Sequence, residues 1–312
     1  MRDRRVLVTG GAGFIGSHVT EALVRAGATV HVLDNLSTGR RDNLPAAARL
    51  FQGDILDGRL LDQALAGVEE VIHLAARVAI RDSLLHFHED ARTNLLGTLA
   101  LLRQCRTHRV RTFLFASSMA VYADSARPDP VPESYTQEPI SPYGLSKLAA
   151  EKYIRLLAGD LGMKCVCLRY FNAYGPRQAS TPYVGVITIF IDNLLRGAPP
   201  VIFGDGKQQR DFVYVNDIVR ATILSLDAGL DNEVMNVGTG RGTSVNEIAR
   251  MLIDKLNPGL EPVYAPAQPG EIRHSVADIS RVRERLGYRP EGILEEKIDE
   301  VIAWKRAPAS GT

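Results

Sequence analysis

The chain of 312 residues carries a formal net charge of +1, and hydrophobic and charged residues make up 45% and 23% of it, as in an ordinary globular protein. This length suits one large α/β unit with a smaller lobe, and the near-neutral charge offers no field that would attract nucleic acid. No apolar run reaches the roughly 18 residues of a membrane span, so no membrane partner is expected, and three cysteines cannot build a disulfide framework, which favours a cytoplasmic location.

Short apolar runs alternate with helical patterns over residues 1–170. Nearly continuous apolar runs are typical of strands buried on both faces, and repeated strand–helix–strand units give a parallel sheet. We therefore predict an α/β fold in which 1–170 form a Rossmann-type, doubly wound parallel sheet. The predicted strands are Arg5–Thr9, Thr29–Leu33, Arg49–Gln52, Glu70–Leu74, Thr112–Ser117 and Lys164–Arg169, and the helices about 15–26, 57–66, 89–108 and 143–161.

Prolines and glycines interrupt this rhythm after residue 170, and only short helices are expected, near 185–196, 216–227, 244–256 and 293–305. Residues 171–312 are predicted to form a smaller C-terminal α+β lobe that binds substrate over the carboxyl edge of the sheet. Alternatively, residues of about 201–240 belong to the first domain, because the chain returns to it there.

A glycine-rich turn follows the first predicted strand and opens a helix. Gly10, Gly13 and Gly16 recur at every third position, with Phe14 and Ile15 between the last two. Dinucleotide binding needs glycine here for a tight turn, for close approach of a pyrophosphate and for packing of the helix on the sheet. The free N–H groups at the helix N-terminus then bind the phosphates.

An acidic residue, Asp34, ends the second predicted strand and is followed by Asn35. A carboxylate at this position accepts hydrogen bonds from the adenosine ribose and repels a 2′-phosphate, which favours NAD over NADP. Arg40 and Arg41 lie nearby and could instead pair with a phosphate. Asp54 and Ile55 after the third strand, and Leu74, Ala75 and Ala76 after the fourth, stand at carboxyl ends where open sheets bind ligands.

A serine, a tyrosine and a lysine form the candidate catalytic set. Ser118 closes the fifth strand, and Tyr143 and Lys147 are four residues apart behind Pro142, so they share one face of a helix. A nearby ammonium and a positive nicotinamide would lower the pKa of the phenol and make it a base, while the serine hydroxyl holds the same substrate oxygen.

Metal binding is not expected. Cys165 and Cys167 would face one side of a strand as reduced core thiols, and neither they nor the pair His86 and His88 find further ligands in the sequence. His73, inside a predicted strand, is expected to be a hydrogen-bonded core residue.

These motifs resemble those of the extended short-chain dehydrogenase/reductase family and, within it, the UDP-glucose 4-epimerases. The resemblance covers nearly the whole chain and is carried by the stretches 9–18, 34–37, 53–55, 116–122, 141–147, 169–172, 210–215, 236–238 and 269–273. It implies NAD-dependent epimerisation of a UDP-hexose at C4, through a transient 4-keto sugar. The pair is UDP-glucose and UDP-galactose, and the N-acetylhexosamine pair is a further candidate. The partners it implies are a UDP-sugar and a second copy of the chain in a homodimer.

The resemblance also assigns roles at matching positions. Tyr143 removes the 4-hydroxyl proton, Lys147 binds the nicotinamide ribose and Ser118 binds the sugar O4. The cofactor site further includes Asn94, Ser117 and Tyr170. The substrate site includes Asn172, Val186, Phe203 beside the uracil, Arg210 and Arg273 as a diphosphate clamp, and Ser275 as the gate for the 2-substituent, with an uncertainty of one residue.

Other branches of the family differ at a few positions. Dehydratases carry acids where this chain has Met119 and Ala120, decarboxylases carry glutamate at Ala120, and uronate epimerases carry threonine at Asn172. Arg81–Asp82 replaces the usual Pro–Arg, which leaves the sugar open. The alternatives are a UDP-uronic acid 4-epimerase, a dTDP-sugar epimerase or reductase, and an NAD-binding protein without catalysis.

Overall fold

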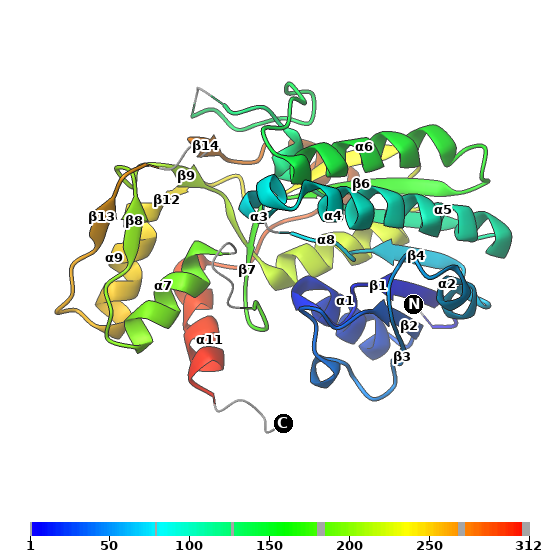
Figure 1. Ribbon diagram of the computed structural model, residues 1–312, viewed down its shortest axis with the longest axis horizontal. Coiled ribbons are helices and arrows are strands. Elements are labelled where there is room, and N and C mark those ends of the chain that lie inside the picture. Colours follow the sequence, from blue (N-terminus) through cyan, green and yellow to red (C-terminus); the bar gives the residue numbers. More distant parts are fainter. Residues whose placement is uncertain (1, 79, 126–127, 180–184, 268–271, 308–312) are drawn as a thin grey trace.

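Seven parallel strands form the central sheet of the computed structural model, which describes residues 2–78, 80–125, 128–179, 185–267 and 272–307 (Figure 1). The strand order is β11-β6-β5-β4-β1-β2-β3, and every neighbouring pair is parallel. The strands are β1 (Arg5–Thr9), β2 (Thr29–Asp34), β3 (Arg49–Gln52), β4 (Glu70–His73), β5 (Thr112–Ser118), β6 (Lys164–Tyr170) and β11 (Glu233–Val237). The predicted Rossmann-type α/β fold is confirmed.

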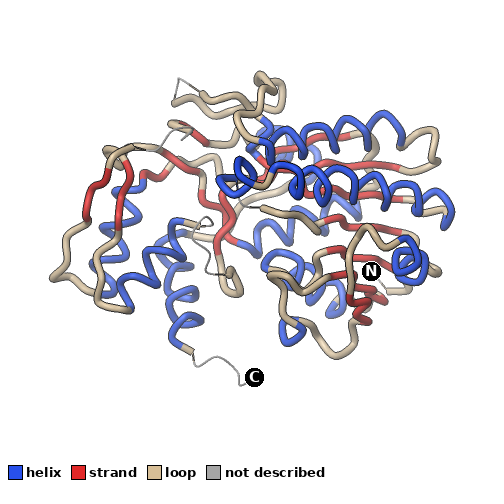
Figure 2. The backbone as a smooth tube through the Cα atoms, viewed as in Figure 1, coloured by secondary structure: helices blue, strands red, loops and turns tan. Residues whose placement is uncertain are grey.

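Helices cover both faces of this sheet, as the blue and red layers of Figure 2 show. One face packs on α1 (Phe14–Arg25) and α8 (Val215–Asp227), with Val19, Leu23 and Ile218 in a shared apolar core. The opposite face packs on α2 (Gly58–Leu65), α5 (Gly97–His108) and α6 (Pro142–Leu157) through a second core. Burial on both sides explains why the strands are apolar throughout.

The chain returns to the central sheet after residue 170. β11 pairs with β6, from Glu233 beside Val166 to Val237 beside Tyr170, and α8 contacts α1. Sequence reasoning left a return over about 201–240 open but did not identify β11 as a strand. The domain boundary at residue 170 stays a prediction.

A smaller lobe lies beyond the carboxyl edge of the sheet, on the left in Figure 1. Its apolar core joins α7 (Val186–Leu195), α9 (Val245–Leu256) and α11 (Leu294–Arg306). Its short strands are β7 (Asn172–Tyr174), β8 (Val201–Phe203), β9 (Gln209–Arg210), β10 (Phe212–Tyr214), β12 (Thr243–Ser244), β13 (Val263–Ala265) and β14 (His274–Ser275). Ser244 caps α9 in a reciprocal capping box with Glu247.

Several predicted bounds differ from the structure. The helix predicted over 89–108 is α4 (Phe87–Ala91), the π-helical turn η2 (Arg92–Leu96) and α5, and such turns are frequent at functional sites. The sequence reasoning missed α3 (Ile80–Leu85) and α10 (Ser280–Leu286), as well as the short 3-10 turns η1 (Arg41–Asn43) and η3 (Met119–Val121). In the described part of the chain, no helix has both the length and the apolar character needed to cross a bilayer.

Candidate functional site

A cavity of about 830 Å³ opens at the carboxyl edge of the sheet, between the sheet and the smaller lobe. This is where open α/β sheets bind ligands, and the volume is at the upper end for ligand sites. Most of the predicted site residues line it: Gly10, Gly13, Phe14, Ile15, Gly16, Asp34, Asn35, Asp54, Ile55, Leu74, Ala75, Ala76, Ser117, Ser118, Tyr143, Lys147, Tyr170, Asn172, Val186, Phe203 and Arg210. Asn94, Arg273 and Ser275 do not.

The turn between β1 and α1 has the close packing that its glycines predict. Gly10 has a φ of +69°, and a Cβ there would lie 2.7 Å from the backbone nitrogen of Ala75. A Cβ on Gly16 would clash with the Gly10 carbonyl oxygen. A Cβ on Gly13 would meet only that oxygen, at 3.3 Å, although Gly13 lines the cavity. The turn is therefore held by Gly10 and Gly16, while Gly13 leaves space for a ligand.

Replacing Gly13 or Gly16 by alanine separates these two roles. Both variants should retain less NAD than the wild type, measured by release of the dinucleotide from denatured protein. Only Gly16→Ala should also lower the melting temperature of NAD-free protein, because its methyl group must displace the turn. Equal melting temperatures for the two NAD-free variants would contradict this assignment.

Asp34 ends β2 and lies beside the same turn. It is 7% exposed, and its carboxylate accepts hydrogen bonds from the backbone nitrogens of Ala12, at 2.9 Å, and Leu36, at 2.8 Å. This fixes an acceptor beside the glycine turn, where a ribose diol would bind. Arg40, by contrast, is exposed, and its guanidinium lies 3.8 Å from Asp42, so it is not held as a 2′-phosphate site. The fit is to NAD.

The catalytic candidates meet on one wall of the cavity. α6 begins at Pro142 behind Ser141, whose hydroxyl accepts from Gly144 N, and this start points Tyr143 and Lys147 toward the end of β5. Ser118 lies near enough to lower the pKa of Tyr143, and Lys147 Nζ donates to the Ala116 carbonyl at 2.9 Å. The three side chains are positioned by β5 and α6, two rigid elements.

Burial governs the ionisation of this wall. It raises the pKa of Tyr143 to about 12, although the nearby Ser118 hydroxyl opposes the change. It lowers the pKa of Lys147 to about 8, against the negative charges of Asp90 and Glu151. The lowered tyrosine pKa expected from sequence is not a property of the chain by itself, because the expected shift included the positive charge of a bound nicotinamide.

Unsatisfied polar atoms also mark the site. Ser117 Oγ, Asn172 Nδ2 and Ser275 Oγ are buried, and none has a hydrogen-bond partner among the described residues. Each such atom costs roughly 1–3 kcal/mol unless something binds it. Ser117 and Asn172 line the cavity, so a cofactor and a polar substrate fit beside them.

The three predicted residues outside the cavity lining have other contacts. Asn94 is buried and bonds to both backbone groups of Arg77. Arg273 forms a two-pronged ion pair with Asp205, at 2.7 and 2.9 Å. Ser275 is buried in β14. Their ligand contacts therefore stay predictions.

Two arginines outside the predicted site residues contribute to the cavity wall; sequence reasoning noted Arg81 beside the sugar pocket but missed Arg177. Arg81 lies with its guanidinium 5.6 Å from the ring centre of Phe203, so α3 reaches across to the smaller lobe. Arg177 also lines the wall, and it pairs with Glu21 at 3.0 Å. The sequence offered only an arginine directly after a strand end or a turn, and this pattern is too common to indicate a binding site.

Histidine and cysteine side chains take structural positions. His73 is buried between the hydroxyls of Thr9 and Thr98, at 2.7 and 2.8 Å, and burial lowers its pKa to about 3, confirming it as a core residue. Cys165 and Cys167 are free and buried. Across the residues that the structure describes, no three His, Cys, Asp or Glu side chains gather as metal ligands would.

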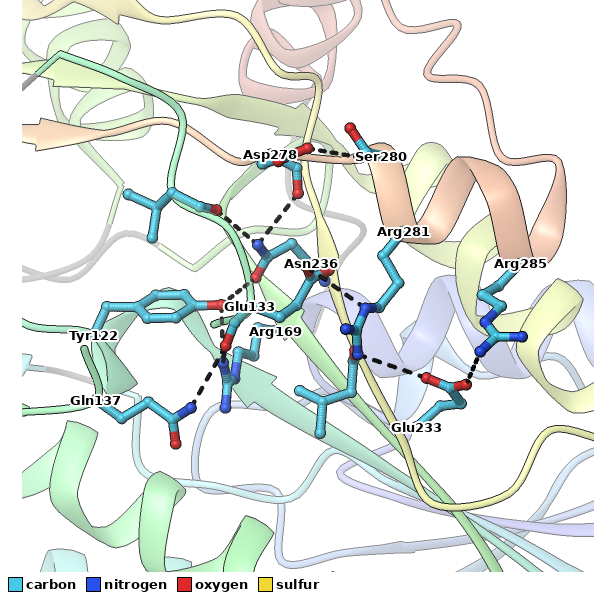
Figure 3. A network of polar contacts seen from close by, with 12 residues as sticks. Tyr122, Glu133, Gln137, Arg169, Glu233, Asn236, Asp278, Ser280, Arg281 and Arg285 are labelled. Carbon is cyan, nitrogen blue, oxygen red and sulfur yellow. Dashed lines mark hydrogen bonds and ion pairs between the residues drawn. The ribbon is translucent and has the colours of Figure 1, made fainter. Parts of the chain in front are cut away.

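A buried polar network lies behind the site, and Figure 3 shows its part around Tyr122, Arg169 and Asn236. Arg169 pairs with Glu151 through two hydrogen bonds of 2.9 and 2.7 Å, and both side chains are 2% exposed. Arg169 also donates to the Tyr122 hydroxyl, which donates to Asn236 Oδ1 at 2.6 Å, and the Asn236 backbone nitrogen donates to Glu133. The network joins β6, β11 and the loop after β5. It therefore fixes the end of β6, where Tyr170 lies.

Comparison with known proteins agrees with this geometry. The model of the NAD dependent epimerase/dehydratase family matches residues 6–238. UDP-glucose 4-epimerase from Thermotoga maritima, solved with UDP-glucose, is 41% identical with a TM-score of 0.93, covering 97% of this chain and 98% of that one. UDP-N-acetylglucosamine 4-epimerase from Methanobrevibacter ruminantium, solved with UDP-N-acetylmuramic acid, is 36% identical with a TM-score of 0.92, covering 98% and 99%.

A third similar structure was solved with the dinucleotide. UDP-glucose 4-epimerase from Thermus thermophilus in complex with NAD is 36% identical with a TM-score of 0.91, covering 97% of this chain and 100% of that one. The family match, these likenesses and the fit of the glycine turn and Asp34 agree on NAD as the cofactor. The chain belongs to the NAD-dependent epimerase/dehydratase family.

Proposed function

We propose that this chain is a UDP-hexose 4-epimerase that interconverts UDP-glucose and UDP-galactose and also accepts the N-acetylhexosamine pair. The observation that carries the proposal is the wall formed by Ser118, Tyr143 and Lys147 beside the glycine turn. Ala120 lines the same cavity where dehydratases and decarboxylases are expected to carry an acid. Without an acid there, C4 oxidation is favoured over loss of a hydroxyl.

Each residue of the proposed active site has a separate role in the reaction. NAD, when bound, supplies reversible hydride transfer at the sugar C4. Tyr143 takes the proton of the 4-hydroxyl and returns it, and Ser118 holds the same oxygen through its hydroxyl. Lys147 places a positive charge beside the phenol, which favours its ionised form. Asn172 offers a buried amide N–H, suited to a neutral, hydroxyl-rich substrate.

The experiment is incubation of purified protein with UDP-glucose, without added cofactor, followed by proton NMR. We expect UDP-galactose to appear, because a reaction without net redox change keeps its NAD. UDP-N-acetylglucosamine, UDP-glucuronic acid and dTDP-glucose are run in parallel. Turnover of the uronate or the dTDP-sugar alone would replace the proposal with that alternative, and NAD binding without any turnover would indicate a non-catalytic protein.

Arg81 is predicted to strengthen substrate binding. Its guanidinium lies over Phe203, the residue proposed to contact the uracil, and it lines the cavity. Arg81→Ala should raise the KM for UDP-glucose about tenfold and leave kcat nearly unchanged, since a charge-assisted contact contributes about 1.5–3 kcal/mol. Arg81→Lys, which keeps the charge but not the planar group, should fall between. A lower kcat with an unchanged KM would contradict this role.

We also propose that the chain forms a homodimer through the helices on the α6 side of the sheet. Apolar side chains are exposed along them: Leu85 (73%) in α3, Phe87 in α4, Leu96 in η2, and Leu145 and Leu156 (74%) in α6. In Figure 1 these helices lie side by side on the upper face. An exposed apolar surface of this kind is typical of an interface between copies.

Light scattering on eluted protein tests the dimer. The wild type should show about twice the chain mass of 34.2 kDa. Leu156→Arg should shift the protein to the monomer, because a charge would be buried in the interface. Leu195→Arg, which changes an exposed leucine of α7 in the smaller lobe, is the matched control and should stay dimeric. A monomeric wild type would refute the proposal.

A further inference from the structure

A carboxylate that is not part of the predicted site lies buried behind the catalytic wall. Asp90, in α4, is 1% exposed and does not line the cavity. Its Oδ1 accepts a hydrogen bond from Ser146 Oγ at 2.7 Å, and its Oδ2 accepts one from Asn94 Nδ2 at 2.8 Å. A buried acid is rarely retained without a charge to balance it.

The two partners of Asp90 connect it to both sides of the catalytic wall. Ser146 directly precedes Lys147 in α6. Asn94 lies in η2, and its amide bonds to the backbone nitrogen and oxygen of Arg77, both at 2.9 Å. Arg77 belongs to the loop after β4 that lines the cavity. Asp90 therefore joins the helix that carries the catalytic pair to the loop beside it.

The charge of Lys147 needs a counter-charge. Lys147 is 3% exposed, its Nζ donates to a neutral carbonyl, and no carboxylate forms an ion pair with it in the described part of the chain. Asp90 and Glu151 are the two acids that raise its pKa, and Asp90 has the larger effect. Glu151 is already bound by Arg169 through both of its oxygens. Asp90 is thus the remaining acid.

Few other ionisable groups act on Asp90. Burial raises the pKa of Asp90, and the charges of Lys147 and Arg77 oppose that rise; Arg77 is itself paired with Asp82 of α3 at 2.8 Å. Asp90 also acts on Tyr143 of α6, where its negative charge opposes ionisation of the phenol. Loss of the carboxylate would therefore lower the pKa of both groups, which favours the phenolate of Tyr143 but removes the proton of Lys147 at lower pH.

We propose that Asp90 is a positioning residue of the reaction, which keeps Lys147 charged inside the protein and fixes α6 against the loop after β4. The expected effect of Asp90 on catalysis rests on the proposed function. The electrostatic coupling between the two charges can be tested without any substrate.

The first test compares the pH dependence of kcat in three proteins. In Asp90→Asn the ammonium of Lys147 should lose its proton at lower pH, so the alkaline fall in turnover should move down by about one pH unit, with roughly a fivefold loss at pH 8. Ser146→Ala removes one hydrogen bond but keeps the charge, and its alkaline fall should stay at the wild-type pH. An unchanged profile in Asp90→Asn would overturn the proposal, whereas absence of turnover in the wild type would refute the epimerase function instead.

The second test needs neither activity nor a folded Asp90→Asn variant. The carboxyl carbon of Asp90 is titrated by NMR in wild-type protein and in Lys147→Met, both freed of NAD. Loss of the neighbouring ammonium should raise the pKa of Asp90, and the same titration in Arg77→Met should give a smaller rise. An identical Asp90 titration in wild type and Lys147→Met would show that the two charges are not coupled, and would overturn the proposal.

Discussion

Tyr143→Phe is expected to lower kcat for the UDP-hexose by about 10²–10⁴-fold while the purified variant still carries NAD. The substitution removes one oxygen from a side chain that is 7% exposed, so the shape of the cavity is kept. What is lost is the group that accepts the proton of the substrate hydroxyl. Because burial raises the pKa of this phenol to about 12, wild-type turnover should also increase with pH from the acid side, as more phenolate forms beside bound NAD.

Ser118→Ala is the matched control for this prediction. It removes the hydroxyl beside Tyr143 but leaves the base, and it should cost about tenfold in kcat, the value of a single hydrogen bond. Single-turnover kinetics and NAD content are measured on both variants. If Tyr143→Phe kept more than a tenth of wild-type kcat, another group would be the base and the proposed mechanism would fail.

Features fixed by local sequence could be predicted well. The strands β1 to β6 were found because burial on both faces leaves a continuous apolar run, and the glycine turn because its backbone tolerates no side chain at Gly10 and Gly16. The pairing of Tyr143 with Lys147 follows from helical spacing alone. These elements supply the catalytic wall and the glycine turn of the cavity.

Features that depend on contacts distant in sequence could not be predicted. β11 reads as an ordinary short apolar stretch, and only its pairing with β6 makes it the edge strand of the sheet. Arg273 was assigned to the diphosphate, but its two-pronged pairing with Asp205 depends on a turn far away in the chain. Asp90 looks like a surface acid on a helix, and its burial against Ser146 emerges only when α4 packs on α6.

The largest effect on stability is expected at the ion pair between Arg169 and Glu151. Both side chains are 2% exposed, so Arg169→Met would leave the Glu151 carboxylate buried without its partner. Breaking a buried pair in this way costs about 3–5 kcal/mol of the free energy of unfolding. Urea unfolding of NAD-free protein measures the loss. Lys255→Met, which breaks an exposed pair with Asp299, is the control and should cost less than about 1 kcal/mol.

The double variant Arg169→Met with Glu151→Leu separates the charge from the packing. If the single variant is unstable because one charge is left alone, removing both charges should recover part of the lost free energy. Recovery should be incomplete, because Arg169 also donates to the Tyr122 hydroxyl, and that hydroxyl bonds onward to Asn236. A double variant as unstable as the sum of the two single ones would mean that the pair stabilises the sheet through shape alone. The network behind β6 would then act as packing rather than as balanced charge.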